Sequence, residues 1–209
     1  RDSGMSPFLM NLAACFIVII INQGLKKYGG DLAIGAFGIV NRLVFIVVMI
    51  VMGLNQGMQP IAGYNFGAKL YGRVNKVLRL TIIYATAVTT FGFLVGMLVP
   101  DLVVGIFTSD AELTELSVTG LRITVMFFPI IGFQMVTSNF FQSIGMAGKA
   151  IFLSLTRQML ILLPCLLVLP QFFGVAGVWY SMPVSDLLAS LIALVMLVCQ
   201  FRKFRTSPL

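Results

Sequence analysis

The sequence predicts an all-α integral membrane protein, a bundle of six transmembrane helices that forms a single domain over residues 1–209. Hydrophobic residues make up 59% of the chain and charged residues only 10%, and the mean hydropathy is +1.02. Soluble chains carry about a quarter charged residues. Stretches such as residues 43–52 are apolar on every face, which is typical of membrane helices rather than of alternating barrel strands. At about 20 residues per crossing plus a connection, six or seven helices fit this length.

Apolar stretches bounded by polar or Gly- and Pro-containing connections define the predicted helices. The first ends before Lys26 and Lys27. The second is long for one crossing, so we expect it to tilt or to bend near Pro60. A basic, amphipathic segment at residues 67–80 precedes the body of the third, and we expect it to lie on anionic lipid as an interfacial helix. The six predicted spans are about 6–25, 34–62, 77–99, 115–141, 150–169 and 175–200.

The distribution of basic residues among the connections indicates the orientation, although Lys26 and Lys27 lie on the opposite side. The connection before the fourth span carries Asp101, Asp110 and Glu112 and has no Lys or Arg. The positive-inside rule assigns the basic side to the cytoplasm, so we expect both ends of this segment to be cytoplasmic. The basic residues on that side include Lys69, Arg73, Lys76, Arg79, Lys149, Arg202 and Lys203.

Composition also excludes several functional classes. The apolar content excludes disorder, and the net charge of +7 is scattered at helix ends, which argues against a nucleic-acid partner. The chain has no histidine, and its cysteines (Cys15, Cys165 and Cys199) are far apart, which argues against a metal site or a disulfide. No nucleophile–base pair or phosphate-binding loop is present, so we expect neither an enzyme nor a cofactor.

Charged side chains inside the spans mark a pathway or a structural pair, because each costs at least a few kcal/mol in hydrocarbon. Asp186 lies eleven residues beyond residue 175, about 16 Å deep, and Arg42 lies about 12 Å deep from the same side. Two hypotheses stay open. Asp186 is a protonatable site that exchanges its proton when a cavity opens to water, or Asp186 and Arg42 form a fixed ion pair that registers two helices.

Prolines and amides inside the spans add further candidates. Proline breaks often line transporter cavities, and the amides exceed what helix packing requires, which indicates a wetted interior. Glycine pairs at 53/57, 63/67 and 92/96 have the spacing of close helix packing. The kink candidates are Pro60, Pro129, Pro164 and Pro183, and the amide candidates are Asn22, Gln23, Asn55, Gln56, Gln59, Gln134 and Asn139.

Several separated strings point to one family. They are GLNQGMQPIAGYNFGAKLYGRV at residues 53–74, FTSDAEL at 107–113, FFQSIGMAGKAIFLSLTRQ at 140–158 and GVAGVWYSMPVSD at 174–186. Their order and spacing resemble the C-terminal half of the multidrug and toxic compound extrusion (MATE) transporters. The chain also begins with Arg1 and not Met, so we expect it to be a piece of a longer protein.

The resemblance implies one lobe of a twelve-helix, pseudo-twofold transporter of the bacterial inner membrane, with the N-terminal six-helix lobe as its partner. Such transporters exchange cationic amphiphilic drugs for H⁺ or Na⁺ by alternating access. Some members bind a cation at acids in the seventh and tenth helices. Here the first span offers Asn22 and Gln23, and the fourth has no acid deeper than Glu115, so sodium binding by this lobe is not expected and the coupling ion stays open.

Two alternatives to secondary active multidrug efflux remain. Flippases of lipid-linked saccharides share the fold implied by the resemblance, but they need a strongly basic cavity. Away from the ends of the predicted spans, the only basic residues inside them are Arg42 and Arg122. A six-helix piece could also act as a non-transporting membrane scaffold. An upstream six-helix half in the parent reading frame would favour transport.

Overall fold

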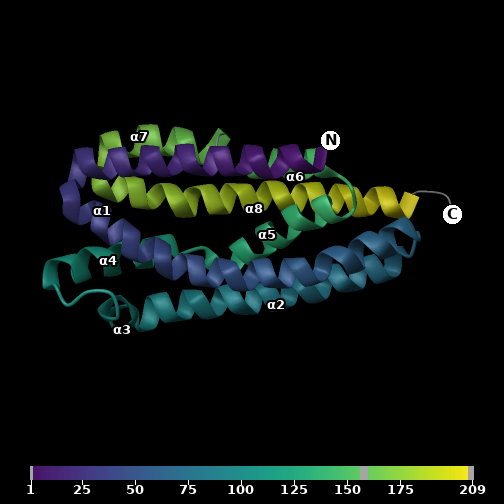
Figure 1. Cartoon of the computed structure of the whole chain (residues 1–209), viewed down its shortest axis with the longest axis horizontal. Coiled ribbons are helices and arrows are strands. Elements are labelled where there is room, and N and C mark those ends of the chain that lie inside the picture. The colour runs from purple at the N-terminus through teal and green to yellow at the C-terminus, as the bar shows by residue number, and fades with distance from the viewer. Residues whose placement is uncertain (1, 156–159, 207–209) are drawn as a thin grey trace.

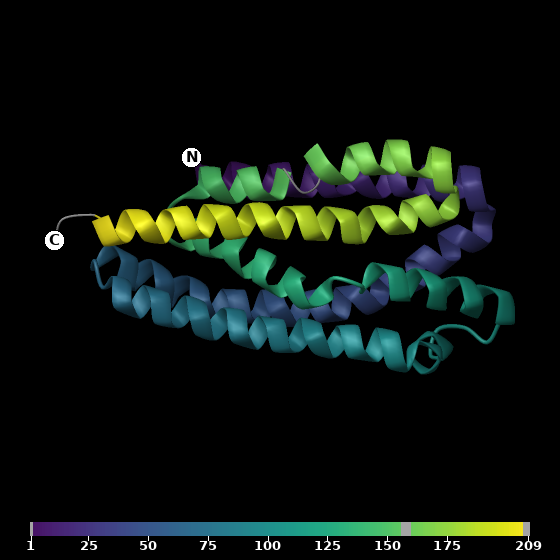
Figure 2. The same ribbon diagram turned by 180° about the vertical axis from the view of Figure 1, so that it is seen from behind.

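The computed structural model describes residues 2–155 and 160–206, which form an elongated bundle of helices with no strand among them (Figure 1). This confirms the all-α prediction. The start of α1 and the end of α8 lie at the same end of the bundle in both side views (Figures 1 and 2). The helices are α1 (Asp2–Gly67), α2 (Tyr71–Leu98), α3 (Pro100–Gly105), α4 (Ala111–Thr124), α5 (Phe128–Ser143), α6 (Ala147–Leu155), α7 (Leu163–Phe173) and α8 (Val175–Thr206).

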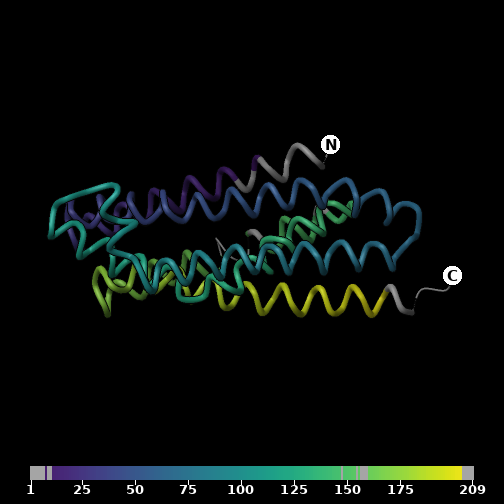
Figure 3. Tube along the Cα trace, turned by 90° about the horizontal axis from the view of Figure 1, so that it is seen from below, coloured from purple at the N-terminus to yellow at the C-terminus, as the bar shows by residue number. Residues whose placement is uncertain are grey.

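Helix α1 consists of two arms that meet at Gly30, where the chain reverses its direction (Figures 1 and 3). Gly30 has φ 72° and ψ −161°, a conformation that glycine adopts without the steric cost a side chain would add. The two arms, residues 2–29 and 31–67, contain the first two predicted spans. Gly30 lies in the connection predicted between these spans. A bend near Pro60 was one option for the long second span, but the backbone keeps helical dihedral angles there.

The basic segment after α1 is not a separate interfacial helix, which corrects that expectation. Residues 68–70 make a tight turn, with Lys69 at φ 59°, and α2 then runs without a break from Tyr71 to Leu98. The reason is that one buried face continues through the basic segment into the apolar one, at three- and four-residue spacing. Its buried residues are Val74, Leu78, Thr81, Ala85, Thr89 and Gly96.

The fourth predicted span is an interrupted helix, and the fifth contains a π-helical turn. Helices α4 and α5 are bent by 58° relative to each other, and Pro129 is the second residue of α5. The fifth span comprises α6, a π-helical turn at residues 160–162 and α7, in which Pro164 is the second residue. The part of this span at residues 156–159 lies outside the described residues. Pro183, by contrast, lies within the uninterrupted α8.

The helices differ in whether they are long and apolar enough to cross a bilayer. Among the described residues, α1, α2 and α8 each contain a stretch long and apolar enough to cross a membrane, and the bent α4–α5 pair adds a fourth. The stretch in α1 is 57 residues long and contains two predicted spans, because the chain reverses at Gly30. The apolar stretch Leu160–Phe173 is shorter.

The arrangement has two layers with a diagonal connection. The first arm of α1 lies with α6, α7 and α8, the second arm lies with α2, and α4 and α5 run between these layers (Figures 1 and 2). Two buried apolar clusters fill the bundle. One includes Ile21, Phe37 and Trp179 near the Gly30 turn, and the other includes Met58 and Phe140 nearer the chain ends.

The glycine pairs differ in how closely a neighbouring helix approaches them. A Cβ on Gly92 or Gly96 would lie 3.0 Å or less from a valine side chain, so this pair does mark close helix packing. Gly53 and Gly57 have nothing within 4 Å of the corresponding position, so the packing expected of that pair is not made within the described part of this chain.

Candidate functional site

A cavity of about 240 Å³ lies between the two layers and is open on the side of α1, where the lining residues Val18 and Asn41 are exposed. Its walls come from both arms of α1, the α4–α5 break, the π-helical turn and α8. Most of the lining is aliphatic or aromatic, which makes the few polar groups the chemically distinctive part of the site. Among the described residues that line it, the polar ones are Asn41, Thr124 and Asp186.

Asp186 is the acidic group of this cavity. It lies on α8, eleven residues after Val175 and therefore about 16 Å along the helix, and its side chain is only 3% exposed. Pro183, three residues earlier, cannot donate a backbone hydrogen bond to the preceding turn. One turn after Asp186, the Ser190 hydroxyl donates to the Ile130 carbonyl oxygen at 3.4 Å, which links α8 to the first turn of α5.

The α4–α5 break brings a helix end to the same cavity. Thr124 is the last residue of α4, and its buried hydroxyl has no hydrogen-bond partner among the described residues. A helix C-terminus carries a partial negative charge, which favours positive charge nearby. The residues Asp186 and Thr124 thus line the same cavity, beside this helix end.

Arg42 is not part of the cavity. It is an exposed residue of α1, and among the described side chains it makes no ion pair with Asp186. Asn41, one residue earlier, does line the cavity. Successive residues point about 100° apart around a helix, so matching depth did not ensure a matching face. The structure therefore does not contain the fixed pair that the sequence left open.

The predicted amides do not gather at one place. Asn55 and Gln134 are buried, and the Asn55 side-chain oxygen has no partner among the described residues. The other amide candidates lie on partly or fully exposed positions away from the cavity lining, and these are Asn22, Gln23, Gln56, Gln59 and Asn139. Of the candidate residues proposed from the sequence, the cavity thus holds only Asp186.

Two polar residues of the cavity, Asn41 and Thr124, were not among the predicted site residues. Asn41 is an amide inside an apolar span, so its type was informative, but its sequence position did not reveal which side of the helix faces the cavity. Thr124 gave no signal by itself, because threonine is common at helix ends. The nearby Pro129 was the available clue to the helix break.

Comparison with a family model gives a match to MatE over residues 7–167. The multidrug export protein MepA of Staphylococcus aureus (strain MSSA476) is 28% identical over 191 residues, which are 91% of this chain and 42% of that protein. This chain therefore spans less than half the length of the curated relatives it matches.

Solved structures of MATE transporters also match this chain over about half of their own length. The MATE multidrug transporter DinF-BH is 36% identical with a TM-score of 0.84, over 98% of this chain and 46% of that one. The outward-facing structure of a multidrug resistance MATE transporter of the MOP superfamily has a TM-score of 0.91 at 18% identity, over 99% of this chain and 47% of that one. At that identity the second likeness concerns the fold alone.

Proposed function

Since this chain belongs to the MatE family, we propose that it forms the C-terminal lobe of a bacterial multidrug exporter and works together with an N-terminal six-helix lobe. The substrates would be cationic amphiphilic small molecules, exchanged for H⁺ or Na⁺ across the inner membrane. The names of the relatives and the half-length match support this proposal. The structural observation that carries it is the buried Asp186 in an apolar cavity beside a broken helix.

The cavity suits a step that couples ion movement to export. In this proposal, Asp186 takes up a proton when the cavity is closed and releases it when water enters. Broken helices recur at coupling-ion sites in transporters because their ends present charge to the ion. With only three polar residues in the described lining, the chemistry of the cavity favours a proton over a fully coordinated sodium ion.

The exposed side of residues 31–67 supports a partner lobe. It combines the amides Gln56 and Gln59 with large apolar groups such as Phe45 and Tyr64, and Tyr64 is 75% exposed. Amides that face hydrocarbon are unfavourable, because lipid offers them no hydrogen bonds. We infer that this face borders the substrate pathway between the two lobes.

No observation favours the alternative functions. No Lys or Arg is among the described residues that line the cavity, whereas a saccharide-lipid flippase needs a basic cavity.

Transport is expected to require both lobes, because the pathway would lie between them. Vesicles that contain residues 1–209 alone should show no ion-driven efflux of a cationic dye, and co-expression of the upstream half of the parent reading frame should restore it. Vesicles with the upstream half alone are the control. Robust efflux by residues 1–209 alone would contradict the proposal.

The proposed orientation gives a labelling prediction. All three native cysteines are free thiols, so they should first be replaced by alanine. In intact cells a membrane-impermeant thiol reagent should then label Asp110→Cys and not Arg73→Cys, because basic connections stay in the cytoplasm. Permeabilised cells, in which both positions should react, provide the control. The reverse pattern in intact cells would rule out the orientation.

A further inference from the structure

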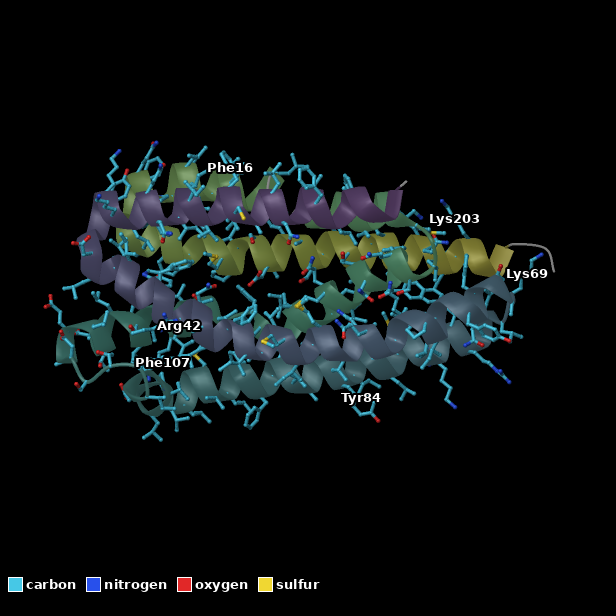
Figure 4. The ribbon with its side chains drawn as sticks, viewed as in Figure 1. Phe16, Arg42, Lys69, Tyr84, Phe107 and Lys203 are labelled. Atoms are coloured by element: carbon cyan, nitrogen blue, oxygen red, sulfur yellow. The ribbon has the colours of Figure 1, made fainter. Side chains whose placement is uncertain are left out.

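A second hollow, separate from the Asp186 cavity, lies between the beginning of α2 and the end of α8. It is a groove of about 650 Å³ at the end of the bundle that also carries Lys69 and Lys203, opposite Phe107 (Figure 4). Arg79 and Arg202 both line it, one from each helix. The proposed export function uses neither the groove nor these two arginines.

The groove is amphipathic along its length. Helix α2 runs from Tyr71 toward the middle of the bundle, so Ile82 lies about 16 Å deeper than Tyr71. Helix α8 runs the opposite way, and Val198 lies about 6 Å deeper than Arg202. Each helix therefore places its arginine about one turn outward of an apolar residue, Arg79 relative to Ile82 and Arg202 relative to Val198. The neutral Tyr71, Gly72 and Asn75 lie farther out on α2.

The side chains of the two arginines lean in opposite directions along the axis of the bundle. Side chains on a helix lean toward its N-terminus. Arg79 therefore leans outward along α2, whereas Arg202 leans inward along α8. Both are exposed, so both are accessible to a ligand in the groove.

Two aromatic rings hold the walls of the groove. The ring of Tyr71 packs against Phe66 with the centroids 5.9 Å apart, and the ring of Phe201 stacks on Phe140 at 6.2 Å and 15°. Phe140 is fully buried in the second apolar cluster. The groove is thus built on fixed side chains and needs little rearrangement to bind a ligand.

Positive charge is concentrated at this end of the described chain. The described acidic side chains lie at the Gly30 end, except for Asp186 in the cavity. Desolvation lowers the pKa of Lys149 below its ordinary value, and the positive charge of Lys203 lowers it further, which reflects this crowding. An anion bound here would relieve the repulsion.

We propose that this groove binds one anionic phospholipid, with its phosphate between Arg79 and Arg202 and an acyl chain along the apolar part near Ile82 and Val198. Basic pockets between helices at a membrane surface are suited to such headgroups, and arginine binds phosphate oxygens in a bidentate manner. The proposal concerns the lipid environment of the lobe, so it does not depend on which compounds are exported.

The test is retention of lipid by the full-length transporter in detergent, measured by native mass spectrometry during titration with dioleoylphosphatidylglycerol. Wild type is expected to retain one molecule, and Arg79→Gln with Arg202→Gln should bind it roughly thirtyfold more weakly, about fivefold for each arginine. Lys69→Gln with Lys76→Gln removes the same charge at the same end outside the groove and should change the affinity by less than about twofold. Equal weakening by both double variants would overturn the proposal.

Two further arms identify the ligand. Dioleoylphosphatidylcholine and inorganic phosphate should each fail to displace the bound phosphatidylglycerol, since one lacks the net charge and the other lacks the acyl chains. Displacement by inorganic phosphate at equal concentration would show a simple anion site and overturn the lipid assignment. Val198→Trp keeps both arginines and fills the apolar part, so it should also weaken retention, and it covers the case in which the arginine variant fails to fold.

Discussion

Asp186→Asn in the full-length transporter is expected to fold normally, to bind its dye and to lose ion-driven export down to the level of protein-free vesicles. Asparagine keeps the shape of aspartate but cannot exchange a proton in the cavity. The measurement is dye efflux from everted vesicles after an imposed pH gradient or sodium gradient, beside equilibrium dye binding. Asp101→Asn, which removes an exposed carboxylate outside the cavity, should transport like wild type. Unchanged exchange by Asp186→Asn would refute the coupling role.

The same variant also tests the absence of an ion pair with Arg42. A buried pair that loses one member costs about 3–5 kcal/mol, and the loss is largely recovered when the second member is removed as well. The structure predicts instead that Asp186→Asn and Arg42→Gln act independently, with a coupling energy below about 0.5 kcal/mol in a double-mutant cycle. Strong coupling between the two would show that the pair forms after all.

Gly132→Ala is expected to lower the free energy of unfolding by about 1–3 kcal/mol, because the new methyl group has no space. Gly132 lies where α5 crosses α2, and an added Cβ would lie 2.8 Å from the Ala85 carbonyl oxygen and 2.9 Å from the Thr89 hydroxyl. That hydroxyl is itself held by a hydrogen bond of 3.1 Å to the Ala85 carbonyl oxygen. Backbone cannot move aside as the end of a flexible side chain can, so α5 would have to shift.

Gly148→Ala is the matched control. Gly148 lies in α6, is exposed and has nothing within 4 Å of the added Cβ. Alanine is about 1 kcal/mol better than glycine in a helix interior, so this variant should be neutral or slightly stabilised. Reversible unfolding in mixed detergent micelles compares the two substitutions. Equal stability of both variants would mean that α5 and α2 are less closely packed than the structure shows.

The fold class could be predicted from the sequence because it depends on the hydropathy of whole segments and not on single contacts. Apolar runs such as residues 43–52 predict helices in lipid whatever their neighbours are. The interruptions were harder to predict. Pro60 was the visible candidate for a bend in the second span, but the helix keeps its dihedral angles there. The chain instead reverses at Gly30, in the connection predicted before that span, where the turn requires a conformation that glycine adopts most easily. The start of α2 was also missed. The basic residues of its first turns do not reveal that the buried face of the apolar part begins among them.

The sequence predicted only those site residues whose type and depth in a span indicate a special role. Asp186 was identified because a carboxyl group is costly at that depth. The hypothesis of a pair with Arg42 rested on matching depth, which is readable from spacing, whereas the direction around a helix depends on tertiary packing. Thr124 entered the cavity through the 58° bend between α4 and α5, and the angle of such a bend is set by the helices packed around it.

The turn at Gly30 also bears on how the chain enters the membrane during its synthesis. The two arms of α1 are joined without a loop, so they would leave the ribosome as one helical hairpin that transfers only a short, weakly charged tip across the bilayer. That tip carries Lys26, Lys27 and Asp31, whose charges partly cancel. Ile21 and Phe37, buried in the same cluster, are only sixteen positions apart in the sequence. Contacts of such short range form early, so the hairpin can serve as the template on which the later helices assemble.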